Sequence, residues 1–297
     1  MRGGKRMTSF QTPEELQGML MRVAKHSPTN QKIALYLEKN YLQVIFMTAS
    51  ELADAMGVSQ GSVSRFFMML GYRGYNDFLR SLQRLVSKQL TGPERLQYSN
   101  SSHKGNHHEV SQVRSILDVE LGNLNSLEEI MQGEDYEAMV SMVTAPHPLI
   151  LLSARMSATL LPYAAYILHK MRADVSVVVP GTDEWGTLEL LDPAHTNVIA
   201  VAFPRYSQTL IQKCRALKKG GFSLCALTDS RLSPMVDIAA HTVCVPVTTA
   251  SLFDIYSTPL AFLNLMLRDA AGRMPQLGAR IEAIEAMERR DRVYFTK

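Results

Sequence analysis

The sequence predicts two domains: a small all-α domain, followed by an α/β domain built on a doubly wound parallel sheet. Three observations support this prediction. A chain of 297 residues is long for one domain and allows two, each with a core of its own. Apolar residues recur at helical spacing over 28–86, whereas short β-rich apolar runs alternate with helical stretches beyond residue 148. The predicted boundaries are a helical domain at 8–90, a linker at 91–108 and an α/β domain at 109–297.

The composition predicts an ordinary soluble protein of the cytoplasm. Hydrophobic residues make up 46% and charged residues 20%, close to the average for globular domains. Each long apolar stretch is interrupted well before the roughly 20 residues that a membrane helix needs, and no signal-peptide core follows the N-terminus. We therefore expect no membrane partner.

The cysteines and the histidine-rich segment predict neither a disulfide framework nor a metal site. Cys214, Cys225 and Cys244 lack CxxC spacing, so we interpret them as small buried hydrophobic residues. His103, His107 and the adjacent His108 lie in the polar linker, where solvated side chains are more common than ligands. No cofactor is expected.

The positive charge is concentrated at the N-terminal end of the chain. The net charge is +3, but residues 1–90 carry 12 Lys and Arg against 6 Asp and Glu, and the rest of the chain is mildly acidic. A basic domain joined to an acidic one favours a polyanion partner for the basic domain only.

Within the helical domain, residues 48–70 have the pattern of a helix-turn-helix. Thr48 followed by Glu51 predicts a capping box at the start of one helix. Gly57 supplies the turn, and Ser59 caps the next helix. Two short helices joined by a glycine also occur in helical domains that do not bind DNA, so the pattern alone leaves both interpretations open.

The second of these helices presents side chains suited to the major groove. Gln pairs with adenine, Arg with guanine or phosphate, Ser with either, and Gly allows close approach. The predicted DNA-contacting residues are Thr48, Ser59, Gln60, Gly61, Ser62, Ser64, Arg65 and Tyr72.

The α/β domain is predicted from five short apolar runs that alternate with helical stretches. This pattern is typical of parallel strands covered on both faces. The predicted strands are 148–154, 174–179, 197–203, 223–229 and 241–247, and the predicted helices are 110–132, 135–145, 157–172, 207–221 and 256–272.

The run "ASELADAMGVSQGSVSRFFMMLGYRGYNDF" resembles the N-terminal domain of the RpiR family of bacterial transcription regulators. The similarity lies in its Ala-x-Glu-Leu-Ala, Gly-Val-Ser, Ser-x-x-x-Ser-Arg-Phe and Leu-Gly-Tyr-x-Gly-Tyr segments. The resemblance implies a double-stranded DNA operator and a following sugar isomerase (SIS) domain that binds phosphosugars. We also expect a homodimer or higher homo-oligomer, because two recognition helices related by a twofold axis read two half-sites.

In the SIS domains that this chain resembles, Gly-x-Gly-x-Ser and Ser-x-Ser-Gly-x-Thr loops cradle the phosphate. Here the first loop reads "SARMSAT" and the second "FPRYSQT", so that two arginines are present and several serines and glycines are replaced. We expect an anionic effector, a sugar phosphate or a sugar acid, held partly by arginine. The predicted effector-binding residues are Ser153, Arg155, Ser157, Arg205, Tyr206, Ser207 and Thr209.

Two alternatives remain at this stage. The altered site could be vestigial, with both arginines paired to acidic neighbours and the domain serving only to dimerise. The chain could also be a phosphosugar isomerase, which needs a carboxylate or histidine base. The acidic candidates are Asp183, Glu184 and Glu189, but no histidine lies in either loop, so we predict a regulator without catalytic residues.

Overall fold

The computed structural model describes residues 10, 12–86, 91–101, 108–249 and 253–295. The chain forms two compact units. The first comprises Met1–Gly122 with Val247–Tyr256, and the second comprises Asn123–Pro246 with Ser257–Lys297. The division therefore differs from a single boundary at residue 109, because a later segment of the chain returns to the first unit.

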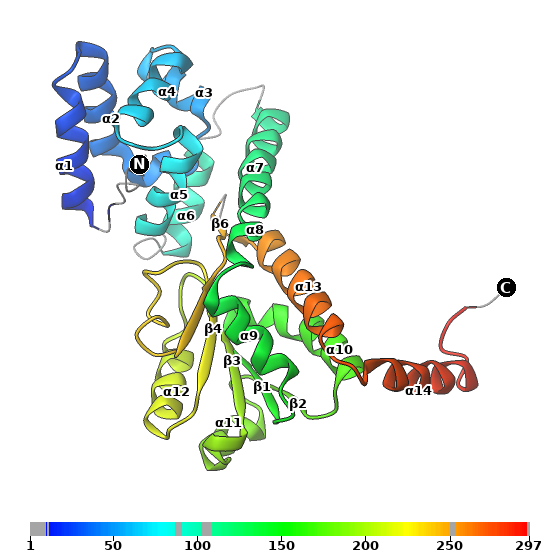
Figure 1. Cartoon of the computed structure of the whole chain (residues 1–297). Helices are drawn as coiled ribbons and strands as arrows, with labels where there is room; N and C mark the ends of the chain where they lie inside the picture. The colour runs from blue at the N-terminus through cyan, green and yellow to red at the C-terminus, as the bar shows by residue number, and fades with distance from the viewer. Residues whose placement is uncertain (1–9, 11, 87–90, 102–107, 250–252, 296–297) are drawn as a thin grey trace, which may run out of the picture. The chain divides into compact units, whose positions relative to one another are not determined.

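Up to residue 86, the first unit contains the predicted helices and one that was not predicted. Figure 1 shows these helices in blue and cyan; they are α1 (Pro13–Ala24), α2 (Pro28–Val44), α3 (Ala49–Met56), α4 (Gln60–Met69) and α5 (Tyr75–Val86). Helix α1 begins after the cap Thr12, whose hydroxyl accepts from Glu15 N, and its buried residues are Leu16, Met19, Leu20 and Val23. This spacing of three and four residues is the sequence signal from which α1 could have been predicted.

An aromatic cluster fixes the end of α4 against α5. The rings of Phe67 and Phe78 lie 4.4 Å apart, and those of Tyr72 and Phe78 lie 5.4 Å apart. The buried Tyr75 hydroxyl donates to the carbonyls of Val44 and Met47, at distances of 3.0 and 2.8 Å. These contacts hold the turn before α3 in place, and with it the start of the helix-turn-helix.

The segment predicted to be a linker contains a helix, α6 (Gly92–Ser101). Arg95 is 1% exposed, and its Nη1 lies 2.9 Å from Asp254 Oδ1, on the short strand β7 (Asp254–Ile255). This strand pairs with β6 (Thr248–Thr249) in an antiparallel hairpin. The prediction of a segment with almost nothing to bury was wrong because Arg95 is buried and pairs with a residue far along the chain. His103 and His107 lie outside the described residues.

The second unit is built on a parallel sheet with strand order β2-β1-β3-β4-β5. The five predicted strands are confirmed, each somewhat shorter than predicted: β1 Leu149–Ser153, β2 Val175–Val178, β3 Asn197–Val201, β4 Leu224–Thr228 and β5 His241–Cys244. β1 and β4 are buried along their whole length, as their continuous apolar runs predict.

Helices cover both faces of this sheet, as a doubly wound fold requires (Figure 1). Helices α9 (Glu134–Thr144), α10 (Leu161–Met171) and α13 (Ser257–Gly272) pack together on one face, and α12 (Gln208–Lys219) joins the core on the other. The remaining elements of this part of the chain are α7 (His108–Asn125), α8 (Leu127–Ile130), η1 (Arg155–Leu160), α11 (Asp183–Thr187), η2 (Leu188–Leu190), η3 (Pro193–His195) and α14 (Leu277–Arg290). Helix α14 was not predicted.

Strand β1 lies between β2 and β3 in the sheet. The chain therefore passes from β1 to β2 on one side of it and then crosses to β3 on the other side. In open α/β sheets this reversal opens a crevice at the carboxyl ends of the two strands. The loops after β1 and β3 therefore meet at the position where such folds bind ligands.

The cysteines are free, and two of them lie in the core. Burial raises the pKa of the Cys214 thiol to about 12, and burial together with the Asp135 carboxylate raises that of Cys225 to about 12. Cys244 is only half-buried. Across the described ranges, no helix is long and apolar enough to span a membrane, and no group of His, Cys, Asp and Glu is arranged to hold a metal ion.

Candidate functional site

The turn between α3 and α4 is defined by local hydrogen bonds. Thr48 Oγ1 accepts from Glu51 N at 3.1 Å, and Thr48 N donates to Glu51 Oε2 at 2.6 Å, which completes the predicted capping box. Gly57 ends α3 with φ 60°, a left-handed conformation that glycine adopts without steric cost. Ser59 then caps α4 by accepting from Ser62 N at 3.2 Å.

The first turns of α4 present a polar, exposed face. Val63 and Phe66 are fully buried, whereas Gln60, Ser64 and Arg65 are exposed. This division follows from the helical period, which turns one side of α4 to the core and leaves the other free. The predicted recognition residues therefore lie together on one accessible surface, which is the arrangement needed to enter a groove.

Hydrogen bonds within the helix-turn-helix order this face. Gln60 Nε2 donates to Ser50 Oγ of α3 at 2.8 Å, and Arg65 Nη2 donates to Ser62 Oγ at 3.3 Å. A Cβ at Gly61 would lie 3.7 Å from Arg65 Nη1, an ordinary van der Waals contact. Gly61 and the Arg65 guanidinium are therefore neighbours on this face.

Two of the predicted DNA-contacting residues have other roles in the structure. Tyr72 is 4% exposed and packs against Phe10 and Phe78, so its ring belongs to the core and the structure does not support the predicted contact with DNA. Sequence pattern could not reveal this because Phe10 and α5 enclose the ring only in the folded domain. Thr48 is half-buried, and its hydroxyl is engaged in the capping box.

The structure also brings a cation to the turn that sequence reasoning missed. Lys32, on α2, is exposed, and its Nζ lies 3.7 Å from the position that a Cβ on Gly57 would occupy. No local pattern links residue 32 to residue 57, so only the tertiary structure identifies this ammonium as part of the basic surface.

In the second unit, hydrogen bonds between β1 and the end of β3 join the two predicted effector loops. The hydroxyl of Ser153, a fully buried side chain, donates to Val201 O at 2.7 Å. Ser157 Oγ accepts from Phe203 N at 3.0 Å. The Ser153 hydroxyl proton is therefore already used, and the Ser157 hydroxyl is engaged with the backbone of the second loop.

Arg155 and Arg205 have the same unusual backbone conformation. Both have φ 59°, the left-handed region that favours glycine, and both side chains are exposed. In the part of the chain that the structure describes, neither guanidinium has a hydrogen bond or an ion pair. The pairing with acidic neighbours that a vestigial site would have is therefore not seen among these residues.

The rest of the second loop is partly committed to the protein itself. The Tyr206 hydroxyl donates to Asp229 Oδ1, and burial together with this carboxylate raises the pKa of Tyr206 well above its usual value. Its ring also packs against the core, so Tyr206 shapes the loop while its hydroxyl is not free to bind an effector. Ser207 caps α12 by accepting from Leu210 N at 3.5 Å, and Thr209 is exposed on the first turn.

The acidic residues considered for catalysis lie elsewhere. Asp183 and Glu184 are exposed on α11, and Glu189 pairs with Lys213 Nζ at 2.6 Å. Neither effector loop contains Asp, Glu or His.

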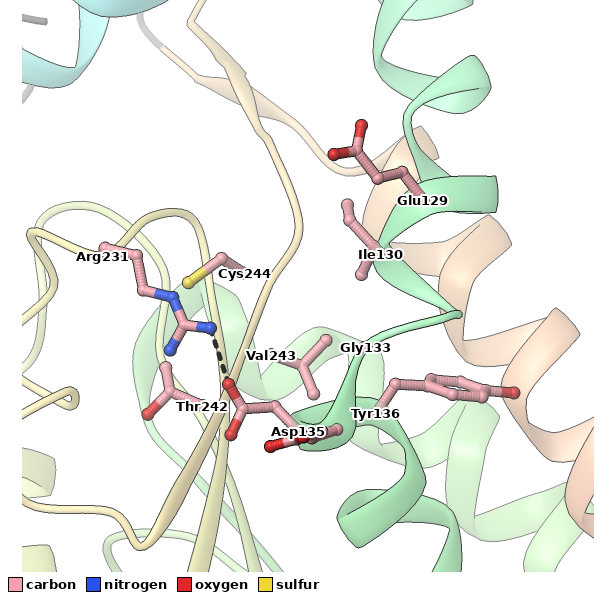
Figure 2. A pocket seen from close by; sticks show the side chains of 10 residues that line it. Glu129, Ile130, Gly133, Asp135, Tyr136, Arg231, Thr242, Val243 and Cys244 are labelled. Atoms are coloured by element: carbon pink, nitrogen blue, oxygen red, sulfur yellow. Dashed lines mark hydrogen bonds and ion pairs between the residues drawn. The ribbon is translucent and has the colours of Figure 1, made fainter. Parts of the chain in front are cut away.

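A cavity of about 440 Å³ lies between the start of α9 and the end of β5 (Figure 2). In it, Arg231 Nη2 lies 2.6 Å from Asp135 Oδ2, and His241 Nδ1 lies 3.4 Å from Asp135 Oδ1. Burial raises the pKa of Asp135, but its hydrogen bonds, that from Arg231 first among them, outweigh this and lower it. None of the predicted effector residues lines this cavity.

Comparison with protein families and solved structures agrees with a helical domain followed by an α/β domain. A family model described as "Helix-turn-helix domain, rpiR family" matches residues 15–89, and one described as "SIS domain" matches residues 144–268. Over 50 residues the chain is 46% identical to an uncharacterized HTH-type transcriptional regulator of Providencia stuartii, a match that spans 17% of this chain and 18% of that relative.

Two solved structures share the fold. The sugar isomerase domain of an RpiR transcription factor from Sphaerobacter thermophilus is 24% identical, with a TM-score of 0.51, over 56% of this chain and 93% of that one. The Vibrio vulnificus NanR protein complexed with ManNAc-6P is 16% identical, with a TM-score of 0.50, over 92% of this chain and 98% of that one. The predicted fold class, a helical domain followed by a doubly wound α/β domain, is thereby confirmed.

Proposed function

Because the chain carries the helix-turn-helix domain of the rpiR family followed by an SIS domain, we propose that it is a bacterial transcription regulator that senses an anionic sugar derivative. It acts as a homodimer on double-stranded operator DNA in the cytoplasm. Binding of the effector shifts the spacing of the two recognition helices and so changes the affinity for the operator, a coupling of typically about 1–3 kcal/mol.

The DNA-binding half of the proposal is supported most directly by the exposed polar face of α4. Arg65 and Gln60 have the donors to read guanine and adenine edges, and Lys32 lies beside the turn, where a phosphate would approach. The excess of 12 basic over 6 acidic residues in 1–90 supplies the long-range attraction.

Binding of labelled genomic operator fragments at a series of salt concentrations tests this half. We expect affinity to fall steeply with salt, because contacted phosphates release counterions. Deletion of residues 1–90 should abolish it, and undiminished binding by the truncated chain would overturn the assignment.

The effector half is supported by Arg155 and Arg205, which have no partner among the described residues and lie on loops that meet at the switch point of the sheet. Arginine grips phosphate and carboxylate groups through two parallel hydrogen bonds, and the start of α12 adds backbone donors. The Vibrio vulnificus NanR protein, which shares the fold, is complexed with a sugar phosphate, and so ManNAc-6P belongs among the ligands tested.

A thermal-shift screen of sugar phosphates, sugar acids and amino sugars tests this half. A ligand in excess over its dissociation constant must raise the melting temperature of the domain that it binds. If no compound raises it, the chain instead belongs to the second candidate class, a regulator whose SIS domain only dimerises. The engaged hydroxyls of Ser153 and Tyr206 favour that alternative, because they leave fewer donors for a phosphate.

We propose no catalytic role for the chain. Isomerisation of a sugar phosphate needs a base within hydrogen-bond reach of the substrate carbons. Neither loop carries a carboxylate or an imidazole, and Glu189 is paired with Lys213. Incubation with aldose phosphates, followed by detection of ketose phosphates, tests this statement.

A further inference from the structure

Helix α14 packs on its own domain through one narrow side. Its Arg280 donates to the carbonyls of His169, Lys170 and Arg172 at the end of α10, at 2.7–3.2 Å, and Glu288 accepts from Lys170 Nζ at 3.0 Å. The half-buried residues of the helix are Leu277, Arg280, Ile284 and Glu288. None of its 14 residues is buried, so most of its circumference is uncovered by the unit to which it belongs.

The side of α14 that faces away from α10 carries one acidic and one basic residue. At 3.6 residues per turn, Glu282, Ala283, Ala286 and Arg289 point away from the residues that contact α10, and all four are exposed. Glu282 and Arg289 are seven residues apart, which places them two turns apart on nearly one line. Within the described ranges, neither has an ion pair or a hydrogen bond through its side chain.

We propose that this face pairs with the same face of α14 in a second copy of the chain, with the two helices antiparallel. When two copies of a helix lie antiparallel, the acidic residue of each copy comes opposite the basic residue of the other. Glu282 of each copy then faces Arg289 of the other, and the twofold axis passes close to Ala286. A parallel pairing would instead set like charges against each other, so the order of charges selects the antiparallel arrangement.

Two alanines allow the helices to approach each other closely. Ala283 and Ala286 carry no bulk between the charges. A helix of 14 residues is only about 21 Å long, so this face buries less than the roughly 800 Å² per partner of a standard interface, and we expect a weak, concentration-dependent dimer.

Figure 1 shows α14 leading away from α13 at the C-terminal end of the chain. The inference rests on the proposed function only in that a regulator of this kind needs a dimer; it adds where the two copies meet.

Sedimentation of the full-length chain over a concentration series tests the contact. Glu282→Arg and Arg289→Glu each turn two attractive pairs into two repulsive ones, so we expect each to raise the dissociation constant of the dimer by about tenfold. The double variant Glu282→Arg/Arg289→Glu restores both attractions and should dimerise like the unmodified chain. An equimolar mixture of the two single variants should also associate, because their charges are complementary.

Glu184→Arg on the exposed helix α11 is the matched control for Glu282→Arg, because it makes the same change in net charge and should leave the dissociation constant unchanged. The variants leave Arg280 and Glu288 intact, and circular dichroism checks that each is folded. Single variants that dimerise like the unmodified chain, or a double variant no better than the singles, would overturn the α14 contact without touching DNA or effector binding. A chain that is monomeric at every concentration would overturn both this contact and the dimer of the proposed function.

Discussion

Replacing Arg155 or Arg205 by glycine should leave the fold intact while removing effector binding. Each residue has φ 59°, which costs an L-amino acid roughly 1–2 kcal/mol relative to a right-handed conformation. Glycine relieves that strain but loses about 0.4–1 kcal/mol through its freer unfolded chain. Because both side chains are exposed, no packing is lost, and the net change in unfolding free energy is a gain of about 0–1.5 kcal/mol. Alanine keeps the strain and should change stability by less than about 0.5 kcal/mol.

The effect of these substitutions on ligand affinity should be much larger than their effect on stability, and it should be the same for glycine and alanine. A hydrogen bond to a charged group contributes about 1.5–3 kcal/mol, so loss of one guanidinium should weaken the effector roughly 10- to 100-fold. The assay combines thermal unfolding of the full chain with calorimetric titration of whichever sugar phosphate or sugar acid the screen identifies. Arg205→Lys should recover little affinity, since an ammonium lacks the planar fork that grips an anion.

Two results would refute this reasoning. Unchanged ligand affinity in folded Arg155→Ala and Arg205→Ala variants would mean that the effector binds elsewhere, with the cavity beside Arg231 the next place to look. Destabilisation by more than about 2 kcal/mol in the glycine variants would mean that the arginines support the loops instead of a ligand.

Three further predictions concern the helical unit. If the side chain reads a base, Arg65→Ala or Gln60→Ala should cost about 1–3 kcal/mol of binding free energy on the specific operator and relax the sequence preference; if it binds phosphate, the variant should weaken binding to all DNA alike. Fluorescence anisotropy with specific and scrambled DNA separates these outcomes. Unchanged binding to both DNAs would mean that the recognition helix is misassigned. Tyr72→Ala should lower the unfolding free energy by about 3–5 kcal/mol in urea titrations, whereas Tyr72→Phe should bind DNA normally, because the ring is buried; selective loss of DNA binding by the phenylalanine variant would contradict this placement. Arg95→Ala should cost about 3–5 kcal/mol in the same titration, because it removes the guanidinium of a buried ion pair with Asp254, and a loss below about 1 kcal/mol would show that the pair is not needed.

The sequence by itself determined the elements that depend on near neighbours. The capping box of Thr48 and Glu51, the left-handed Gly57 and the Ser59 cap are bonds between residues three or four positions apart, so their pattern is visible in the chain. The continuous apolar runs likewise predicted the five strands, because a strand buried on both faces has no polar alternation. The helices α1, α6 and α14 were missed although the apolar spacing of α1 was present in the sequence.

Only the tertiary structure decided how these elements use their side chains. The strand order joins the loops after β1 and β3, and that neighbourhood engages the Ser153 hydroxyl with a strand carbonyl while leaving Arg155 exposed. Arg95 meets Asp254 across 159 positions of the chain, and the ring of Tyr72 is covered by residues of other segments. Hydrogen bonds and burial between distant residues depend on how whole elements pack, and local pattern carries no record of that packing.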